Sequence, residues 1–244
     1  MDNLDNKVEQ KDTTVSDGRT VWREYFQSFC TAIILALFIR TFVVQAFKIP
    51  SESMEPNLLV GDHLLVNKML YALPTGALEK ALSPKREVKR HDIVVFKYPM
   101  NRERDFIKRV VALPGERVRI ENKQVYIDDA PLDDPFAHFE TPPRPPGTHL
   151  SFNSRRDDMA EMVVPRDHYF VMGDNRDNSH DSRFWGSLPK ELVKGRALVI
   201  YWSFDAPKEA YMATEPMEKI KWYGNLALNF FGQTRWDRFF HLVR

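Results

Sequence analysis

The stretch DFIKRVVAL at residues 105–113 decides the fold of this chain. It has the length of a strand and is rich in β-branched residues, which favour extended backbone. In strict alternation, Lys108 shares one face of this strand with Phe106 and Val110, so its ammonium group is turned toward the core. Alternatively, the strand lies at a sheet edge, or the lysine side chain extends over the apolar surface to solvent.

Similar strand-length runs lie on both sides of this stretch and are separated by turn residues. They read HLLVNKML, DIVVFKY, VRIENKQVYI, HYFVMGD and RALVIYW, and many of them alternate apolar and polar positions. The segment between Asp133 and Gly147 is dense in proline, so it is not a central strand and is expected in an inserted lobe at about residues 116–167. The pattern therefore predicts a mostly β domain over residues 48–205.

Length and composition limit the function classes. The chain has 244 residues, which corresponds to one large domain or to one domain with appendages. Its formal net charge is +1, so binding to nucleic acid by bulk attraction is not expected. The single cysteine, Cys30, excludes an internal disulfide and a metal site built on cysteines.

Residues 25–47 form the most apolar segment, which one charge at Arg40 interrupts. As a helix they would extend about 34 Å, enough for the hydrocarbon core of a bilayer, which is about 30 Å thick. We interpret the segment as a membrane anchor in which Arg40 reaches the outer head groups. A cleaved signal peptide, with Val44 and Ala46 before the cleavage point, and a buried core helix are the alternatives.

The two ends of the chain differ from the β domain in composition. Basic residues in the polar tail, residues 1–24, outnumber those just after the anchor, so the positive-inside rule places the N-terminus in the cytoplasm and the β domain outside. The C-terminal tail, residues 206–244, mixes Trp, Phe, Leu and Arg. It lies in the membrane interface, packs back on the β domain, or follows that domain as a surface helix.

Two further stretches are rich in polar side chains. The run IPSESMEP at residues 49–56 holds two serines between prolines, whose restricted backbone fixes a hydroxyl and a neighbouring N–H in place, as acyl transfer needs. Taken alone, it is equally typical of a serine-rich turn. The run GDNRDNSHDSR at residues 173–183 is typical of an Asx-rich loop, because a calcium loop would need a central glycine and a terminal glutamate.

Together, and in this order, five motifs resemble those of bacterial type I signal peptidases, the leader peptidases of the Ser/Lys-dyad family S26. The motifs are IPSESMEPNL, GDHLLVNK, DIVVFKYP, RDFIKRVVALPGE and GDNRDNSHDSRFWG, and the resemblance covers about residues 43–186. It implies a catalytic domain of antiparallel sheets, partly barrel-like, with an N-terminal transmembrane helix. It also implies a serine endopeptidase of the cell membrane that removes signal peptides from exported preproteins on the extracytoplasmic side, in association with the export pathway.

The same resemblance implies that Ser53 is the nucleophile, that Lys108 is the general base, and that the Ser51 hydroxyl and the Ser53 N–H form the oxyanion hole. A lysine with an ordinary pKa of about 10.4 is almost fully charged at pH 7, so a base needs burial that lowers this pKa to about 7. That change corresponds to about 4.6 kcal/mol against the charged form. The neutral amine then takes the serine proton and returns it to the leaving amine.

Supporting roles follow from the resemblance as well. It implies that Ser179 orients the lysine and that Asp181 and Arg183 pair to support the site. It implies no cofactor and no metal, and the histidines, including His180, are expected to take no part.

The family cuts after small residues at the first and third positions before the bond, an A-x-A pattern. Small apolar pockets give this preference because they reject bulky side chains by overlap. Glu52 stands between the two serines, where the family often has glycine, and its charge is expected to alter the rate and not the mechanism. The residues expected to wall the pockets are Ile49, Met54, Leu58, Phe106 and Ile107.

Two other functions are compatible with the same motifs. A soluble Ser/Lys self-cleaving regulator of related fold would carry a DNA-binding or protein-interaction segment in place of the anchor. An anchored β module without enzymatic activity would present signal peptides without cutting them.

Overall fold

The computed structural model describes residues 18–68, 87–145, 154–205 and 216–243, and it divides the chain into two compact units at Thr41 and Phe42. In the first unit, helix α1 covers Gly18–Phe38. The π-helical turn η1 follows over Ile39–Val43 and contains the boundary between the units. The helix predicted over residues 25–47 therefore begins earlier, inside the predicted polar tail, and ends earlier. Residues 44–47 are apolar enough for either structure, but they belong to strand β1 (Val44–Lys48), whose backbone pairs with β2. Residues 1–17 lie outside the described part of the chain.

No helix in the described ranges combines the length and the apolar character that a membrane crossing needs.

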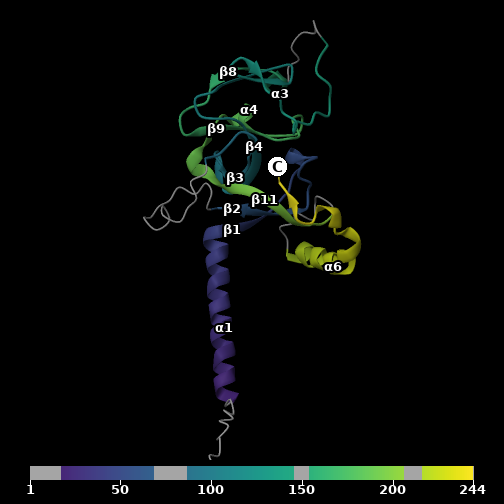
Figure 1. Ribbon diagram of the computed structural model, residues 1–244. Helices are drawn as coiled ribbons and strands as arrows, with labels where there is room; N and C mark the ends of the chain where they lie inside the picture. The colour runs from purple at the N-terminus through teal and green to yellow at the C-terminus, as the bar shows by residue number, and fades with distance from the viewer. Residues whose placement is uncertain (1–17, 69–86, 146–153, 206–215, 244) are drawn as a thin grey trace, which may run out of the picture. The chain divides into compact units, whose positions relative to one another are not determined.

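The second unit is built mainly from one large antiparallel sheet (Figure 1). Its strand order is β1-β2-β11-β3-β4-β9-β10, and β12 pairs with β11 beside this path. The new strands are β2 (Asp62–Asn67), β3 (Ile93–Tyr98), β4 (Asn101–Ala112), β9 (His168–Met172), β10 (Leu188–Pro189), β11 (Val193–Ser203) and β12 (His241–Leu242).

A smaller sheet follows β4 along the chain and lies within the range predicted for the insertion. Its order is β7-β6-β5-β8, with all three pairings antiparallel. The strands are β5 (Arg117–Glu121), β6 (Gln124–Ile127), β7 (Ala130–Pro131) and β8 (Met159–Val163).

The fold is thus mostly β with antiparallel sheets, as predicted. In the described residues neither sheet closes on itself, so the partly barrel-like closure is not found. Short helical segments connect the strands, and one longer helix, α6, precedes the C-terminal strand. They are η2 (Glu52–Met54), α3 (Ser154–Asp157), α4 (Ser182–Trp185), η3 (Lys190–Leu192), α6 (Pro216–Gln233) and η4 (Trp236–Arg238).

Strand β4 joins the three hydrophobic clusters of the core. Ile107 belongs to a cluster with β2, β3 and β11, and Val110 belongs to one with β3 and β9. Val111 and Ala112 belong to a third cluster, which they share with the smaller sheet. Apolar burial contributes most of the stabilising free energy of folding. The packing of β4 in all three clusters therefore stabilises both sheets and holds them together.

The end of the C-terminal tail packs on the β domain. Strand β12 pairs with β11, where Leu242 lies opposite Val199. The Arg238 guanidinium donates to both carboxylate oxygens of Asp62, at 3.1 and 2.6 Å. Asp62 is fully buried, so this ion pair fastens the tail beside the start of β2.

A buried ion pair also joins β4 to the turn after β9, which is residues 173–181 between β9 and α4. The Nε and Nη2 atoms of Arg109 each donate to a carboxylate oxygen of Asp174 at 2.7 Å, and neither side chain is exposed. The Asn57 amide donates to the same carboxylate at 2.9 Å. The pair therefore joins three separate segments of the chain.

Replacing Asp174 by Asn should destabilise the protein strongly, because it leaves the Arg109 charge buried without its counter-ion. We expect a loss of about 3–5 kcal/mol in the free energy of unfolding, measured by urea denaturation of the full chain in detergent. Asp129→Asn is the matched control: its ion pair with Arg117 is exposed to solvent, so little change in the free energy of unfolding is expected. Equal losses in the two variants would contradict this account.

Candidate active site

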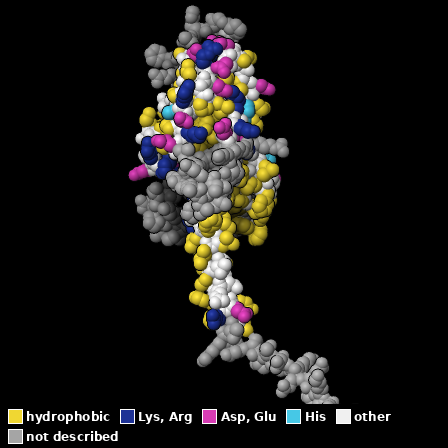
Figure 2. Space-filling model, turned by 60° about the vertical axis from the view of Figure 1, so that its left-hand side comes forward, with side chains coloured by type: hydrophobic (Ala, Val, Ile, Leu, Met, Phe, Trp, Pro, Cys, Tyr) yellow, Lys and Arg dark blue, Asp and Glu magenta, His cyan; other side chains and the backbone are white. Residues whose placement is uncertain are grey.

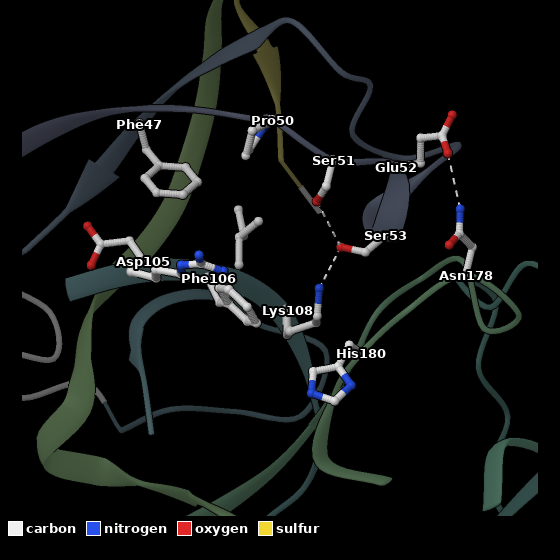
Figure 3. Close-up of a pocket in the computed structure, with 12 residues that line it drawn as sticks. Phe47, Pro50, Ser51, Glu52, Ser53, Asp105, Phe106, Lys108, Asn178 and His180 are labelled. Atoms are coloured by element: carbon white, nitrogen blue, oxygen red, sulfur yellow. Dashed lines mark hydrogen bonds between the residues drawn. The ribbon is translucent and has the colours of Figure 1, made fainter. Parts of the chain in front are cut away.

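The Ser53 and Lys108 side chains meet in a pocket of about 500 Å³ (Figure 3). The segment that precedes β2 forms one wall of this pocket, and the first half of β4 forms another. The turn after β9 completes it. The lining residues are Phe47, Pro50, Ser51, Glu52, Ser53, Arg104, Asp105, Phe106, Ile107, Lys108, Asn178 and His180.

Local structure fixes the position of Ser53. The residue lies in the 3-10 turn η2 and is 8% exposed. Its carbonyl oxygen accepts a hydrogen bond from the backbone N–H of Asn175 at 3.2 Å, and Leu58 N–H donates to Met54 O just beyond it. Backbone hydrogen bonds within its own segment and with the turn after β9 therefore hold the serine in place.

Gly173 allows that turn to approach the serine closely. A Cβ at this position would lie 2.3 Å from the Ser53 carbonyl oxygen and 2.3 Å from the Ser179 hydroxyl oxygen. Real Cβ atoms do not approach backbone oxygens so closely, so only glycine fits here without movement of the Ser53 backbone.

Lys108 lies within hydrogen-bonding distance of the serine. Its Nζ donates to Ser53 Oγ at 2.5 Å, and the side chain is buried, so the buried alternative of the sequence analysis applies. Burial lowers the pKa of Lys108 from 10.5 to about 8, because an apolar environment disfavours the charged amine. The negative charges of Asp181 and Asp174 oppose this decrease, and the positive charge of Arg183 adds to it.

Ser51 is exposed at the pocket, next to the nucleophile candidate. Its Oγ lies 3.5 Å from Ser53 Oγ. It occupies the N-cap position of η2 and makes no capping hydrogen bond with its side chain, so this hydroxyl is not held by that turn. The arrangement leaves it available to a group bound in the pocket.

Asp181 and Arg183 form a buried pair at the start of α4. The Asp181 carboxylate accepts from Arg183 Nε and Nη2, both at 2.8 Å, and from Gly173 N–H at 3.0 Å. Burial alone would raise the pKa of Asp181, but Arg183 and these hydrogen bonds outweigh burial and lower the pKa. Arg183 also donates to the Arg176 carbonyl at 2.8 Å, so the pair stabilises the turn after β9.

Ser179 is buried in the same turn. Its hydroxyl lies close enough to the Asp181 carboxylate to help lower the pKa of Asp181, and no hydrogen bond of normal geometry joins it to Lys108 in the described part of the chain, so its role in orienting Lys108 stays a prediction. The hydroxyl faces Gly173, where it occupies the space that a Cβ would need.

Only two of the five predicted pocket residues line this pocket. Phe106 and Ile107 do, because β4 forms a wall. Ile49, Met54 and Leu58 do not: they are 0%, 0% and 2% exposed and belong to the core cluster beneath the serine segment. The segment 49–58 is irregular, so closeness to Ser53 in sequence did not imply that these side chains face the same space.

The sequence analysis missed several residues that shape the site. Phe47 and Pro50 line the apolar part of the pocket, and Asn178 and His180 line the polar part. The Arg109 pair with Asp174 was missed too, although an arginine inside the apolar run of β4 is a signal for a buried partner. No group of three or more metal-binding side chains occurs in the described part of the chain.

Comparisons with known proteins agree with these motifs. A family model described as signal peptidase, peptidase S26, matches residues 22–202. Signal peptidase I of Aquifex aeolicus is 34% identical over 236 residues, which cover 78% of this chain and 88% of that protein. Probable signal peptidase I-2 of a Synechocystis species is 37% identical over 192 residues, with 77% and 76% covered. A crystal structure of a signal peptidase I from Enterococcus faecalis matches 46% of this chain and 97% of that one, at 28% identity and a TM-score of 0.36.

The Lys108 amine should titrate well below an ordinary lysine. Competitive acetylation across a pH series, read by mass spectrometry of the Lys108 peptide, should give a midpoint near 8 in the folded protein and near 10.5 in urea. Asp181→Asn should lower the folded midpoint further, because it removes a charge that stabilises the ammonium form. A folded midpoint equal to the one in urea would contradict the burial of this amine.

Proposed function

Because the chain belongs to the signal peptidase family, peptidase S26, and is a peptidase, we propose that it removes N-terminal signal peptides from exported preproteins with Ser53 as nucleophile and Lys108 as general base. The observation that carries the proposal is the 2.5 Å separation between Lys108 Nζ and Ser53 Oγ in a pocket. A nucleophile and its base need to lie within hydrogen-bond reach of each other, which extends to about 3.2 Å between heavy atoms.

The lowered pKa of Lys108 supports the first step. With a pKa of about 8, about one amine in ten is neutral at pH 7, against roughly one in 3,000 for an ordinary lysine. The neutral amine accepts the Ser53 proton while Oγ attacks the scissile carbonyl carbon. No histidine is needed as base.

The groups around the serine support the later steps. The Ser51 hydroxyl and the Ser53 N–H stabilise the negative charge that develops on the carbonyl oxygen. The protonated Lys108 gives its proton to the leaving amine, the C–N bond breaks, and an ester on Ser53 remains. The lysine then takes a proton from water, and the hydroxide attacks the ester carbon. The bond to Ser53 Oγ breaks, the lysine returns the proton to Oγ, and the signal peptide leaves with a new carboxyl end. Asp181 and Arg183 hold the turn that carries Gly173 and Ser179 in place beside the Ser53 segment.

The pocket also supports a preference for small residues before the bond. Phe47, Phe106 and Ile107 supply apolar walls, and they give a side chain in the pocket no polar partner of their own. Bulky side chains would overlap with these walls, whereas alanine would fit. We therefore expect cleavage after an A-x-A pattern, with Phe106 and Ile107 as wall residues.

Helix α1 is the proposed membrane anchor. Many of its large apolar side chains are exposed, including Trp22, Phe29 and Ile34 at 75%, 63% and 68%. Figure 2 shows apolar side chains on the surface of this helix. Such a surface is unfavourable in water and favourable in lipid. We propose a cytoplasmic N-terminus and an extracytoplasmic peptidase domain that works beside the export pathway.

Ser53→Ala and Lys108→Met should each lower kcat for a synthetic signal peptide by about 10⁴-fold or more, because each removes one member of a unit that acts together. Cleavage is measured by liquid chromatography of the products. Lys97→Met is the matched control, since that lysine is half-buried outside the pocket and donates to the Arg102 carbonyl. Retained cleavage in either dyad variant, with circular dichroism like that of the wild type, would exclude this dyad.

The pH profile of kcat/KM should rise with pH through an apparent pKa near 8 and then level off, since only the neutral amine of Lys108 is a base. In Asp181→Asn the rising limb should move to lower pH, because the amine then loses its proton more readily. Asp129→Asn, far from the pocket in an exposed pair, should leave the limb unmoved. A limb near 10.5 in the wild type would argue against Lys108 as the base.

A further inference from the structure

Arg104 brings a positive charge to the pocket. Its side chain lines the pocket and is exposed. The charged residues close to it in β4 have partners of their own: Arg102 lies 3.6 Å from Glu191, and Asp105 pairs with Lys194 at 2.6 Å. Within the described ranges, the Arg104 guanidinium makes no ion pair and no hydrogen bond. Its charge is therefore available to a group bound in the pocket.

Arg104 belongs to the apolar side of the pocket. It directly precedes Asp105 in β4. In Figure 3, Asp105 and Phe47 lie together on one side of the Ser53–Lys108 pair. Under the function proposed above, this apolar side holds the substrate residues that come before the scissile bond.

The edge of β4 gives an extended substrate a path toward Arg104. One edge of this strand pairs with β3 over residues 105–109. The other edge pairs with β9 only from Arg109 onward, so no strand of the described chain occupies it over residues 104–108. All residues of this stretch line the pocket. An extended peptide can add to such an open strand edge.

Spacing along this edge decides which substrate residue meets Arg104. Lys108 contacts Ser53, so it marks the residue just before the scissile bond. Arg104 comes four positions earlier in β4, which corresponds to about 13 Å at about 3.3 Å per residue. An extended substrate advances by the same length per residue, so its fourth and fifth residues before the bond lie level with Arg104.

We propose that Arg104 makes this peptidase favour an acidic over a basic residue at the fourth or fifth position before the scissile bond. The inference rests on the proposed function and names a feature of its substrates. A carboxylate at this position is attracted to the unpaired guanidinium, whereas an ammonium group is repelled. Neither acidic neighbour cancels the effect, because Asp105 is paired with Lys194 and Glu103 does not line the pocket.

The test compares three peptides that differ only at the fifth position before the bond, where they carry Glu, Gln or Lys, and a second set varied at the fourth. Successive side chains of an extended peptide point to opposite sides, so one of the two sets should show the effect. For the wild type in about 20 mM salt, kcat/KM should be roughly two- to fivefold higher for Glu than for Gln, and lower again for Lys. In about 500 mM salt the differences should shrink, because a shorter Debye length screens the charges.

Two variants and a control assign the preference to this side chain. Arg104→Gln should cleave the Glu and Lys peptides at similar rates, and Arg104→Glu should reverse their order. Arg102→Gln is the matched control and should keep the wild-type order, because that arginine is exposed too and does not line the pocket. If either Arg104 variant keeps the wild-type preference, or if the wild type shows none in both sets, the inference is overturned.

Failure of the proposed function is seen separately. The wild type would then cleave no peptide of either set, or Ser53→Ala would cleave them as well as the wild type does. Equal cleavage of all peptides by the wild type, abolished in Ser53→Ala, would leave the proposed function standing and reject the role of Arg104.

Discussion

The burial of the Lys108 amine against the Ser53 hydroxyl is the constraint on which the rest of the structure depends. A charged amine is disfavoured in an apolar surrounding, so the same packing that places the lysine also lowers its pKa to about 8. The strand that carries Lys108 must therefore be central and covered on both faces. Strand β4 meets this requirement, since its residues take part in all three core clusters.

The turn after β9 holds the Ser53 segment in its position beside Lys108. Its backbone contacts the serine segment through Asn175 N–H and Ser53 O, and Gly173 makes the approach possible because it has no Cβ. The turn itself is held by buried ion pairs, among them Asp174 with Arg109 and Asp181 with Arg183. Each pair costs desolvation, and both give the turn a single defined position.

The sequence predicted what depends on local periodicity and missed what depends on tertiary packing. Alternation along residues 105–113 offered an inward Lys108 as one of two alternatives, because the period of a strand is two, and the burial of the side chain in the structure decides between them. Alternation could not place Met54, because its segment is not a regular strand and has no period. The Met54 side chain lies in the core and not at the pocket. Residues 44–47 are a third case. In the sequence they continue the apolar run of the predicted helix, but they form strand β1 because their backbone pairs with β2. The approach of Gly173 to Ser53 joins positions far apart in the chain, so no local pattern could predict it.

The electrostatic balance around Lys108 explains why burial can set its pKa. Two carboxylates, Asp174 and Asp181, favour the ammonium form, and left unpaired in a buried site they would hold the amine charged. Each carboxylate is instead paired with a guanidinium through two hydrogen bonds, and the positive charge of Arg183 opposes the effect of the carboxylates on the amine. Desolvation is the largest influence, and it acts in the direction that a base requires. Arg183 thus holds the turn after β9 in place and, through its charge, helps Lys108 to lose its proton near neutral pH.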